Sequence, residues 1–382
     1  MRSPGLKVIT LPLYYFTSYL CRYSVIPVEA FIFEETGLSY SELGLSLALL
    51  YIGYALALFP AGVMAGIYGA NTGLLVGCLG TSLANTLLFL EVRPPYLYVS
   101  LFVNGLSQGF MWPSLMQIAS LNYPSDYVDR VIGYMLTAAI LGPTGVFVLS
   151  WAISLHLYWR YTFLIYPSLL ILLTAYLLPR SKLSARLSSH RVVVMKVLTN
   201  RYVAVLGMSY ACFYAVLRGL LSWLPSILLE TEGLTSLESP LYSGFFPLIG
   251  AFSAGVGAYL ARERVGVKQL VMGSFLLTSL LLSLTLLLEV HGWSIALVFL
   301  VLSMPEWLFF TVLPLVLTPS EVSVASGLID AMGYLGGALG ASLIGVVYDA
   351  YGSFELSLTV LACLALLGAV LSHLLPPKVD RA

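Results

Sequence analysis

The sequence YYFTSYLCRY, residues 14–23, lies in the middle of an apolar stretch that runs from residue 6 to residue 33. A bilayer core about 30 Å thick is crossed by about 20 helical residues, so this stretch is long enough to span it, with Arg22 well inside. A charge at that depth is costly and is retained where it faces a cavity or a partner. On a helix, Tyr15, Tyr19 and Arg22 share one face. That face combines a cation with phenol hydroxyls, which suits the binding of an anion.

The same pattern recurs later in the chain. Arg218 lies in a second apolar stretch, 196 residues after Arg22, with Tyr214 one helical turn before it. Each arginine precedes a glycine by 15 residues, and the two glycines lie in similar loops, EETGLS at residues 34–39 and ETEGLT at residues 230–235. We interpret the shared arginine, spacing and loop as an internal duplication.

The composition is that of a multi-spanning membrane protein. Of the 382 residues, 59% are hydrophobic and 9% are charged, whereas soluble domains are about a quarter charged. Equal numbers of basic and acidic residues, 18 each, argue against a nucleic-acid partner, which needs a basic surface. The stretch at residues 6–33 is too long for a cleavable signal peptide and lacks its cleavage site, so it is expected to be the first membrane helix.

Cysteine usage predicts neither disulfides nor a metal site, and no cofactor is expected. The cysteines lie inside apolar spans without a CxxC pair, so we expect small core residues. The four are Cys21, Cys78, Cys212 and Cys363.

Polar breaks divide the chain into twelve apolar spans, which predicts an all-α membrane protein with 12 transmembrane helices. The only long polar break predicts a cytoplasmic linker at 180–200 between two six-helix halves, 1–179 and 201–382, related by pseudo-twofold symmetry. Ser39 and Glu42 predict a capping box at the start of the second span. The spans are 6–33, 40–66, 70–91, 95–119, 129–154, 159–179, 201–229, 239–261, 266–289, 292–317, 321–348 and 353–375.

The distribution of basic residues predicts the orientation. Apart from the two buried arginines, fourteen Lys and Arg residues fall on the side of the N-terminus, and only Arg93 and Arg160 fall on the other. Basic residues favour the cytoplasmic side. We therefore expect a multi-pass protein of the plasma membrane with both termini in the cytoplasm.

Parallel six-helix repeats are the layout of transporters that bind substrate between the halves near the membrane midplane. Glycines support the duplication, since Gly133 and Gly142 are nine residues apart in the fifth span and Gly327 and Gly336 are nine apart in the eleventh. We expect the glycine-rich eleventh span to pack closely against a neighbouring helix.

Four motifs then suggest a family. They are NGLSQGFMWP at 104–113, WRYTF at 159–163, RGLLSWLP at 218–225 and GYLGG at 333–337. Together and in this order they resemble the organophosphate:phosphate antiporter family of the major facilitator superfamily, over nearly the whole chain.

The resemblance implies an anion site. In that family the arginines of the first and seventh helices clamp the phosphate, which implies this role for Arg22 and Arg218. The family's pocket tyrosines correspond to Tyr15, Tyr19, Tyr54 and Tyr334. Within the fourth-helix motif, Gln108 and Trp112 are further candidate substrate-binding residues, as is Tyr214 beside the second arginine.

The chain also departs from the family. Leu141 or a neighbour replaces a fifth-helix histidine, Tyr23 replaces a basic residue after the first arginine, and Leu58 lies near a position that carries lysine. The loop motif after the second span has Gly66 and Ile67 in place of an acid and an arginine. With fewer positive charges around the arginine pair than in that family, a monoanion or a carboxylate is also a possible substrate.

Three acidic residues fall within the predicted spans and are candidates for coupling or gating. Glu306, surrounded by apolar residues, is expected to carry a proton during transport or to pair with one of the two arginines. Glu29 is expected two turns beyond Arg22 on the same helix face. Asp330 is expected near the inner end of its helix, in a solvated or capping position.

We therefore predict a monomeric secondary transporter for a small organic anion, most simply a phosphate ester or inorganic phosphate, working by alternating access. Two alternatives stay open: a proton-coupled symporter for an organic carboxylate, and a receptor that binds the anion without moving it. A membrane enzyme is not expected, because the sequence has no HExxH motif and its four histidines fall at span ends or in loops.

Overall fold

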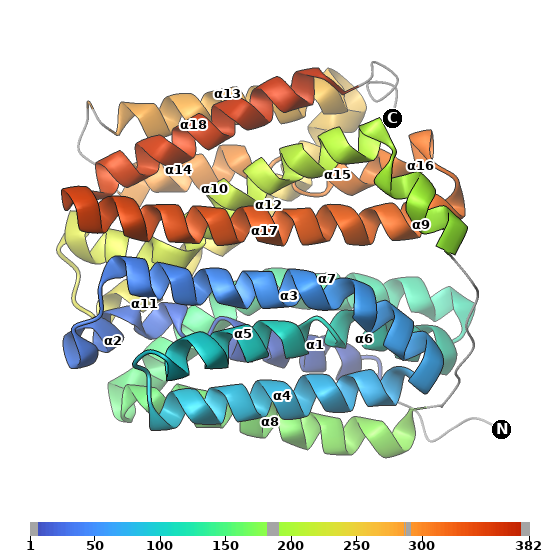
Figure 1. Ribbon diagram of the computed structural model, residues 1–382, viewed down its shortest axis with the longest axis horizontal. Helices are drawn as coiled ribbons and strands as arrows, with labels where there is room; N and C mark the ends of the chain where they lie inside the picture. The colour runs from blue at the N-terminus through green and yellow to red at the C-terminus, as the bar shows by residue number, and fades with distance from the viewer. Residues whose placement is uncertain (1–6, 182–190, 286, 288–291, 376–382) are drawn as a thin grey trace. The chain divides into compact units, whose positions relative to one another are not determined.

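The computed structural model describes residues 7–181, 191–285, 287 and 292–375, and these residues form helices and turns without a strand (Figure 1). The prediction of an all-α protein is confirmed. The α-helices are α1 (Thr10–Arg22), α2 (Glu29–Thr36), α3 (Tyr40–Tyr68), α4 (Ala70–Leu90), α5 (Tyr96–Gln108), α6 (Met111–Asn122), α7 (Ser125–His156), α8 (Thr162–Leu177), α9 (Arg191–Leu198), α10 (Arg201–Glu232), α11 (Glu238–Ser243), α12 (Phe245–Leu260), α13 (Val267–Leu284), α14 (Gly292–Leu302), α15 (Leu308–Thr311), α16 (Leu313–Val316), α17 (Pro319–Tyr351) and α18 (Phe354–His373).

Nine helical segments of the described residues are long and apolar enough to cross a membrane. They coincide with nine of the twelve predicted spans. The other three predicted spans are present as interrupted helices: α1 with α2, α5 with α6, and α14 with α15 and α16. The prediction of twelve membrane helices in two six-helix halves is therefore confirmed.

Prolines account for the interruptions. A proline inside a helix removes an N–H donor, and its ring clashes with the carbonyl four residues earlier. Pro27 lies in the break between α1 and α2, within the short 3₁₀ helix η1 (Ile26–Val28). Pro113 follows the break between α5 and α6, and Pro305 lies in the break between α14 and α15. At these points the backbone does not make the hydrogen bonds of a continuous α-helix.

The helices group into two compact units. Described residues before 182 belong to unit 1 and those after 190 to unit 2, with two exceptions of ten residues each. Ser39–Ala48, the start of α3, belongs to unit 2, and Thr235–Gly244, which contains α11, belongs to unit 1. The predicted boundaries of the halves stay a prediction, and residues 182–190 of the predicted linker lie outside the described residues.

The two exceptions begin at equivalent positions of the duplication, because Ser39 and Thr235 each follow their arginine by 17 residues. Both open with a capping box. In the first, Ser39 N donates to Glu42 Oε2 (2.9 Å) and Glu42 N donates to Ser39 Oγ (3.2 Å), which confirms the predicted box. In the second, Thr235 N donates to Glu238 Oε2 (3.1 Å) and Glu238 N donates to Thr235 Oγ1 (3.2 Å). The duplication therefore extends to local hydrogen bonding.

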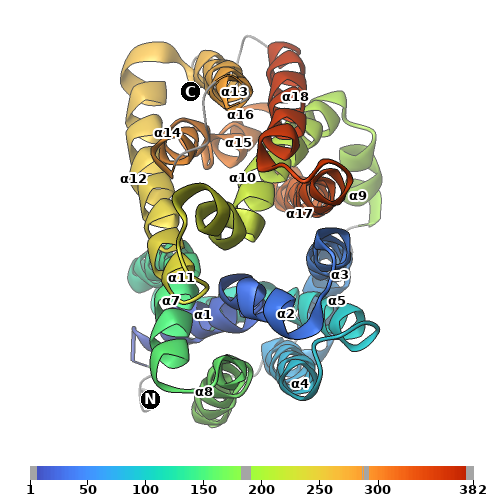
Figure 2. The same cartoon turned by 90° about the vertical axis from the view of Figure 1, so that its left-hand side faces the viewer.

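In unit 2, the predicted close packing of the glycine-rich helix is present between α17 and α10, which lie side by side (Figures 1 and 2). A side chain at Gly336 or Gly340 would overlap the backbone of α10 at Ala211 or Ala215. Trp223 Nε1 of α10 also donates to Ala341 O of α17 (2.8 Å). The apolar window of α10 is 94% buried, against 39–61% for the other eight membrane-crossing segments, so this helix is shielded from lipid.

The start of α17 is held by charged and polar bonds outside its apolar span. Lys196 Nζ of α9 lies 2.6 Å from Glu321 Oε1. Thr318 N and Thr318 Oγ1 both donate to Glu321 Oε2, each at 2.8 Å. Together these contacts hold the pKa of Glu321 at about 2, below its ordinary value of 4.5.

We expect Glu321→Gln to lower the thermal unfolding midpoint of the detergent-solubilised protein near pH 7, by a few degrees. The lowered pKa means that ionised Glu321 stabilises the folded state fully above about pH 4.5, and that this contribution is lost as the pH falls towards about 2. The gap between wild type and variant is therefore expected to shrink near pH 3. A gap that is the same at both pH values would contradict the assignment.

Candidate functional site

Each of the two repeat-equivalent arginines lies in a cluster of aromatic and polar side chains within its own unit. The Arg22 cluster of unit 1 consists of Tyr15, Tyr19, Arg22, Tyr54, Gln108 and Trp112. The Arg218 cluster of unit 2 consists of Tyr210, Tyr214, Arg218, Glu306, Asp330 and Tyr334.

Arg22 is the last residue of α1, and its side chain is 1% exposed. The guanidinium carbon lies 4.3 Å from the ring centre of Tyr54 and 4.7 Å from that of Tyr19. Its NH2 group donates to Gln108 Oε1 at 3.3 Å. Aromatic faces attract a cation most strongly where water is excluded. The charge is therefore held by ring faces and an amide oxygen contributed by α1, α3 and α5.

Tyr15 extends the Arg22 cluster along α1. Its ring centre lies 5.2 Å from that of Tyr19 in an edge-to-face arrangement and 5.0 Å from that of Trp112. Trp112 comes from α6, just beyond the break that ends α5 at Gln108. All six substrate-binding residues predicted from the first half of the chain are therefore brought together in unit 1.

Arg218 lies within unbroken α10 and is 7% exposed. Its NH2 group donates to the Tyr214 hydroxyl at 3.4 Å, and its guanidinium carbon lies 4.8 Å from the Tyr214 ring centre. The Tyr214 ring lies 5.5 Å from that of Tyr334 on α17 and 4.6 Å from that of Tyr210, a turn earlier on α10. Tyr214 thus contacts Arg218 directly, and Tyr334 packs against Tyr214.

Two acidic residues join the Arg218 cluster. The charge of Arg218 acts on the Glu306 carboxyl, and both Glu306 and Asp330 act on the Tyr214 hydroxyl. Glu306 lies in the turn between α14 and α15 and is half-buried. The predicted role of Glu306, to carry a proton or to pair with one of the two arginines, stays a prediction.

The expectation for Asp330 is wrong in one respect. The residue is half-buried and lies well inside α17, which begins at Pro319, so it is not a capping residue. The helix begins earlier than the predicted span because the Thr318 capping box starts it. The charge of Asp330 acts on the hydroxyls of Tyr210 and Tyr214 of α10.

The expectation for Glu29 is also wrong in its geometry. Because the helix stops at Arg22 and restarts at Glu29, the two residues are not on one continuous helix face. The turn at Tyr23–Val25 and the η1 helix separate them. Glu29 is instead the first residue of α2 and is fully buried, with 0% exposure.

Other residues in or next to the clusters were not predicted as site residues. Tyr210 precedes Tyr214 by four residues, so its position on the same face of α10 was visible in the spacing. Asn85 and Asn104 are fully buried amides that contact the end of α1. Their polarity inside apolar spans was the available signal.

The two clusters differ in charge at corresponding positions. Gln108 follows Arg22 by 86 residues, and Glu306 follows Arg218 by 88. Both lie where the fourth helix of their half is interrupted. A neutral amide thus contacts the first arginine, whereas a carboxyl group interacts with the second.

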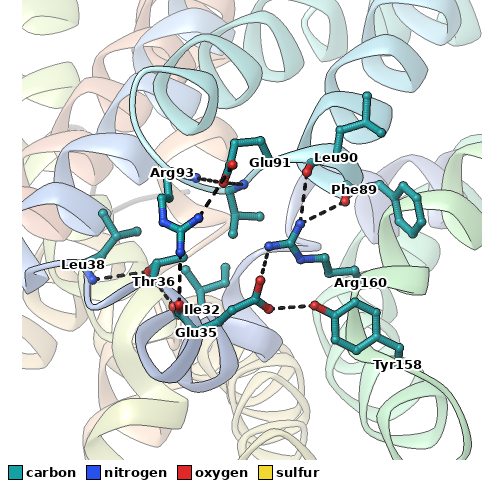
Figure 3. Close-up of polar contacts among 11 residues, drawn as sticks. Ile32, Glu35, Thr36, Leu38, Phe89, Leu90, Glu91, Arg93, Tyr158 and Arg160 are labelled. Carbon is teal, nitrogen blue, oxygen red and sulfur yellow. Dashed lines mark hydrogen bonds and ion pairs between the residues drawn. The ribbon is translucent and has the colours of Figure 1, made fainter.

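The WRYTF motif serves a different part of unit 1. The Arg160 NH1 group donates to the carbonyls of Phe89 and Leu90 at the end of α4, both at 3.2 Å, and its NH2 group pairs with Glu35 of α2 (Figure 3). Tyr158 donates to the same carboxylate at 2.7 Å. These bonds join the ends of α2 and α4 to the start of α8, so this arginine has a structural role.

Among the described residues, no group of three or more His, Cys, Asp or Glu side chains could hold a metal ion. Three of the cysteines are buried as expected, whereas Cys363 is exposed on α18, which corrects the prediction for that residue. Helix faces that meet lipid also carry exposed apolar residues, and Cys363 fits that setting.

Comparison with known proteins agrees with this architecture. The sequence model described as Major Facilitator Superfamily matches residues 13–318. A quinolone resistance transporter of Acinetobacter baumannii is 22% identical over 100% of this chain and 96% of that protein. A probable hexose phosphate transport protein of Chlamydia muridarum is 22% identical (90% and 85% covered), and a hexuronate transporter of Bacillus subtilis is 24% identical (88% and 86%). The resemblance to phosphate-ester transporters is confirmed at this distance.

Among solved structures, a bacterial homolog of the human lysosomal transporter Spinster, inward-facing and unoccupied, superposes with a TM-score of 0.82. It is 15% identical, with 97% of this chain and 96% of that chain covered. At this identity the match establishes the fold alone.

Proposed function

Since the chain belongs to the major facilitator superfamily, and so is a multi-pass membrane transporter of small solutes and not an enzyme, we propose that it carries a small organic anion. The substrate is a phosphate ester or inorganic phosphate, and Arg22 and Arg218 both bind it. The protein works in the plasma membrane as a monomer, with both termini in the cytoplasm and halves at 1–179 and 201–382 joined by a linker at 180–200.

The observation that carries this proposal is the pair of buried arginines at equivalent positions of a duplication. A guanidinium stays charged when buried and offers a planar pair of donors that matches an oxyanion. Arg22 and Arg218 are 1% and 7% exposed, and each lies over a tyrosine ring that keeps it away from bulk water. Two such sites in one transporter favour an anionic substrate.

The remaining predicted residues then have defined roles. Four aromatic residues contact the uncharged part of the substrate and hold Arg22 in place: Tyr15, Tyr19, Tyr54 and Trp112. Beside Arg218, the same two roles belong to Tyr214 and Tyr334. Relatives named for hexose phosphate and hexuronate transport both suggest a sugar bearing one acidic group. Hydroxyl-rich sugars suit a surface of phenols, which donate and accept hydrogen bonds.

Transport follows from alternating access. Bound anion neutralises the two arginines and lowers the barrier between outward-open and inward-open states, so an anion is exchanged for another. Glu306, Asp330 and Glu29 are proposed to act in coupling or gating.

One observation favours a second candidate function. Glu306 interacts with Arg218, so this acid can replace the substrate as countercharge in the empty carrier and can carry a proton. A proton-coupled symporter for an organic carboxylate uses the same site.

Counterflow in proteoliposomes tests the proposal. Vesicles are loaded with unlabelled phosphate, glucose 6-phosphate or glucuronate at equal pH on both sides, and the labelled compound is added outside. We expect transient accumulation of labelled phosphate or glucose 6-phosphate, and none of labelled glucose, the uncharged control. Counterflow of glucuronate alone would favour the carboxylate symporter. Binding of an anion to purified protein without any counterflow would favour a receptor, and counterflow of glucose would overturn the anion proposal.

A further inference from the structure

The backbone at the end of α1 is held by side chains. The last four carbonyls of a helix lack an amide partner within it, and α1 ends at Arg22 because Pro27 prevents the helix from continuing. Cys21 O, in that last turn, accepts from Asn104 Nδ2 at 2.9 Å and from Asn85 Nδ2 at 3.4 Å. Two amide donors thus converge on the carbonyl immediately before Arg22.

These donors are themselves oriented by further hydrogen bonds. Asn85 Nδ2 also donates to Thr81 O of its own helix at 2.9 Å, and Asn85 Oδ1 accepts from Ser24 Oγ at 3.0 Å. The amide of Asn85 therefore has one orientation that satisfies both of its ends, and it braces the residue that follows the break.

A second chain of bonds runs from Asn104 to the guanidinium. Gln108 Nε2 donates to Asn104 Oδ1 at 3.4 Å and to Ser18 O at 3.0 Å, which leaves Gln108 Oε1 to accept from Arg22 NH2 at 3.3 Å. Asn104 therefore contacts the backbone before Arg22 through its nitrogen and the side-chain partner of Arg22 through its oxygen. A change at Asn104 affects both ends of the arginine.

The three amides of this network are buried. Asn85, Asn104 and Gln108 are 0% exposed. Hydrogen bonds in such surroundings are strong, and an unmade one is costly, so a satisfied network permits a single arrangement. The three amides also add no charge to the cluster, which an aspartate or glutamate in their place would do.

We infer that Asn104, supported by Asn85, is a positioning residue that sets the place and direction of the Arg22 guanidinium through the interrupted backbone of α1. This rests on the proposed function in so far as Arg22 binds the transported anion. Neither asparagine touches the anion: their effect passes through Cys21 O and Gln108.

The test uses Asn104→Leu in the purified full-length protein, with Asn85→Leu as a weaker change and Ser100→Ala as the control. Ser100 lies one turn before Asn104 on α5 and is equally buried, but no bond from it to α1 is part of the network. Two readouts are taken: the rate at which phenylglyoxal modifies Arg22, followed by mass spectrometry with Arg218 of the same molecule as reference, and the equilibrium binding of glucose 6-phosphate and glucuronate.

In Asn104→Leu we expect modification of Arg22 to be several-fold faster while that of Arg218 is unchanged, and the anion Kd to rise about 10-fold at unchanged binding stoichiometry, since a loosened guanidinium loses roughly one well-made hydrogen bond. Asn85→Leu is expected to show a smaller change and Ser100→Ala none. A general loss of structure would instead speed modification of both arginines and lower the stoichiometry, and the decision would then pass to Asn104→Ser. An unchanged Arg22 rate in a folded variant would overturn the inference.

The two readouts separate this inference from the proposed function. If Asn104→Leu frees Arg22 for modification but the wild type binds none of the anions, the positioning role stands and the anion proposal fails. If the wild type binds an anion through Arg22 and Asn104→Leu changes neither readout, the anion proposal stands and the positioning role fails. Should Asn104→Leu not fold, Asn104→Ser retains a shorter donor and is expected to give an intermediate change in the same direction.

Discussion

Arg218→Lys is expected to reduce anion transport roughly 100-fold, nearly as far as Arg218→Ala, in the counterflow assay. Lysine keeps the charge but loses the planar fork that binds an oxyanion through two parallel hydrogen bonds. It also loses the stacking that places the guanidinium 4.8 Å from the Tyr214 ring centre. A charged hydrogen bond is worth about 1.5–3 kcal/mol, and about 2.8 kcal/mol corresponds to the expected factor.

Arg22→Lys is expected to behave alike, because the duplication gives Arg22 the equivalent position and two tyrosine rings at 4.3 and 4.7 Å. Arg130→Lys is the matched control. Arg130 also lies over a tyrosine ring, at 5.5 Å from the centre of Tyr127, but it is exposed and outside both clusters. Near-normal transport by Arg218→Lys would show that charge alone suffices and would overturn the proposed clamp.

The sequence predicted the members of both clusters better than it predicted the backbone that carries them. The spacing of Tyr15, Tyr19 and Arg22 needs only one helix, and these residues do lie together on α1. The prediction for Glu29 assumed that the helix continues beyond Arg22. The helix ends there, because Pro27 lies in a 3₁₀ helix that interrupts it. Periodicity is reliable within a helix and loses its meaning at a break.

Hydrogen-bond partners that are distant in the sequence were harder to predict. The capping box of Ser39 and Glu42 was visible because its bonds are local. The start of α3 is also held by Asp349, whose carboxylate accepts from Tyr40 N (3.0 Å) and Ser41 N (2.7 Å) across more than 300 residues of sequence. Nothing in the local pattern around Asp349 indicates this partner. The same limit applies to Asn104, whose partner is a backbone carbonyl that is available only because α1 ends there.

The second large effect is expected for Glu306→Gln. Glu306 is proposed to offset the charge of Arg218 in the empty carrier, so that the carrier can return without substrate; the electrostatic interaction of the two groups supports this role. Glutamine has nearly the same shape and no charge, as Gln108 has at the corresponding position of the first half. We therefore expect Glu306→Gln to abolish net uptake of the anion, including accumulation driven by a pH gradient. Exchange of labelled for unlabelled anion, with substrate on both sides of the vesicle membrane, is expected to fall less than about 3-fold.

Glu306→Asp is the matched control, because it keeps the charge and shortens the side chain. It is expected to retain part of the net uptake. Asp330→Asn reports on the other acid that acts on Tyr214 and Tyr210. Wild-type accumulation by Glu306→Gln would exclude this residue from coupling, and loss of exchange together with accumulation would place it in substrate binding. The comparison decides between an obligate exchanger, in which only substrate offsets Arg218, and a symporter, in which Glu306 does so between substrates.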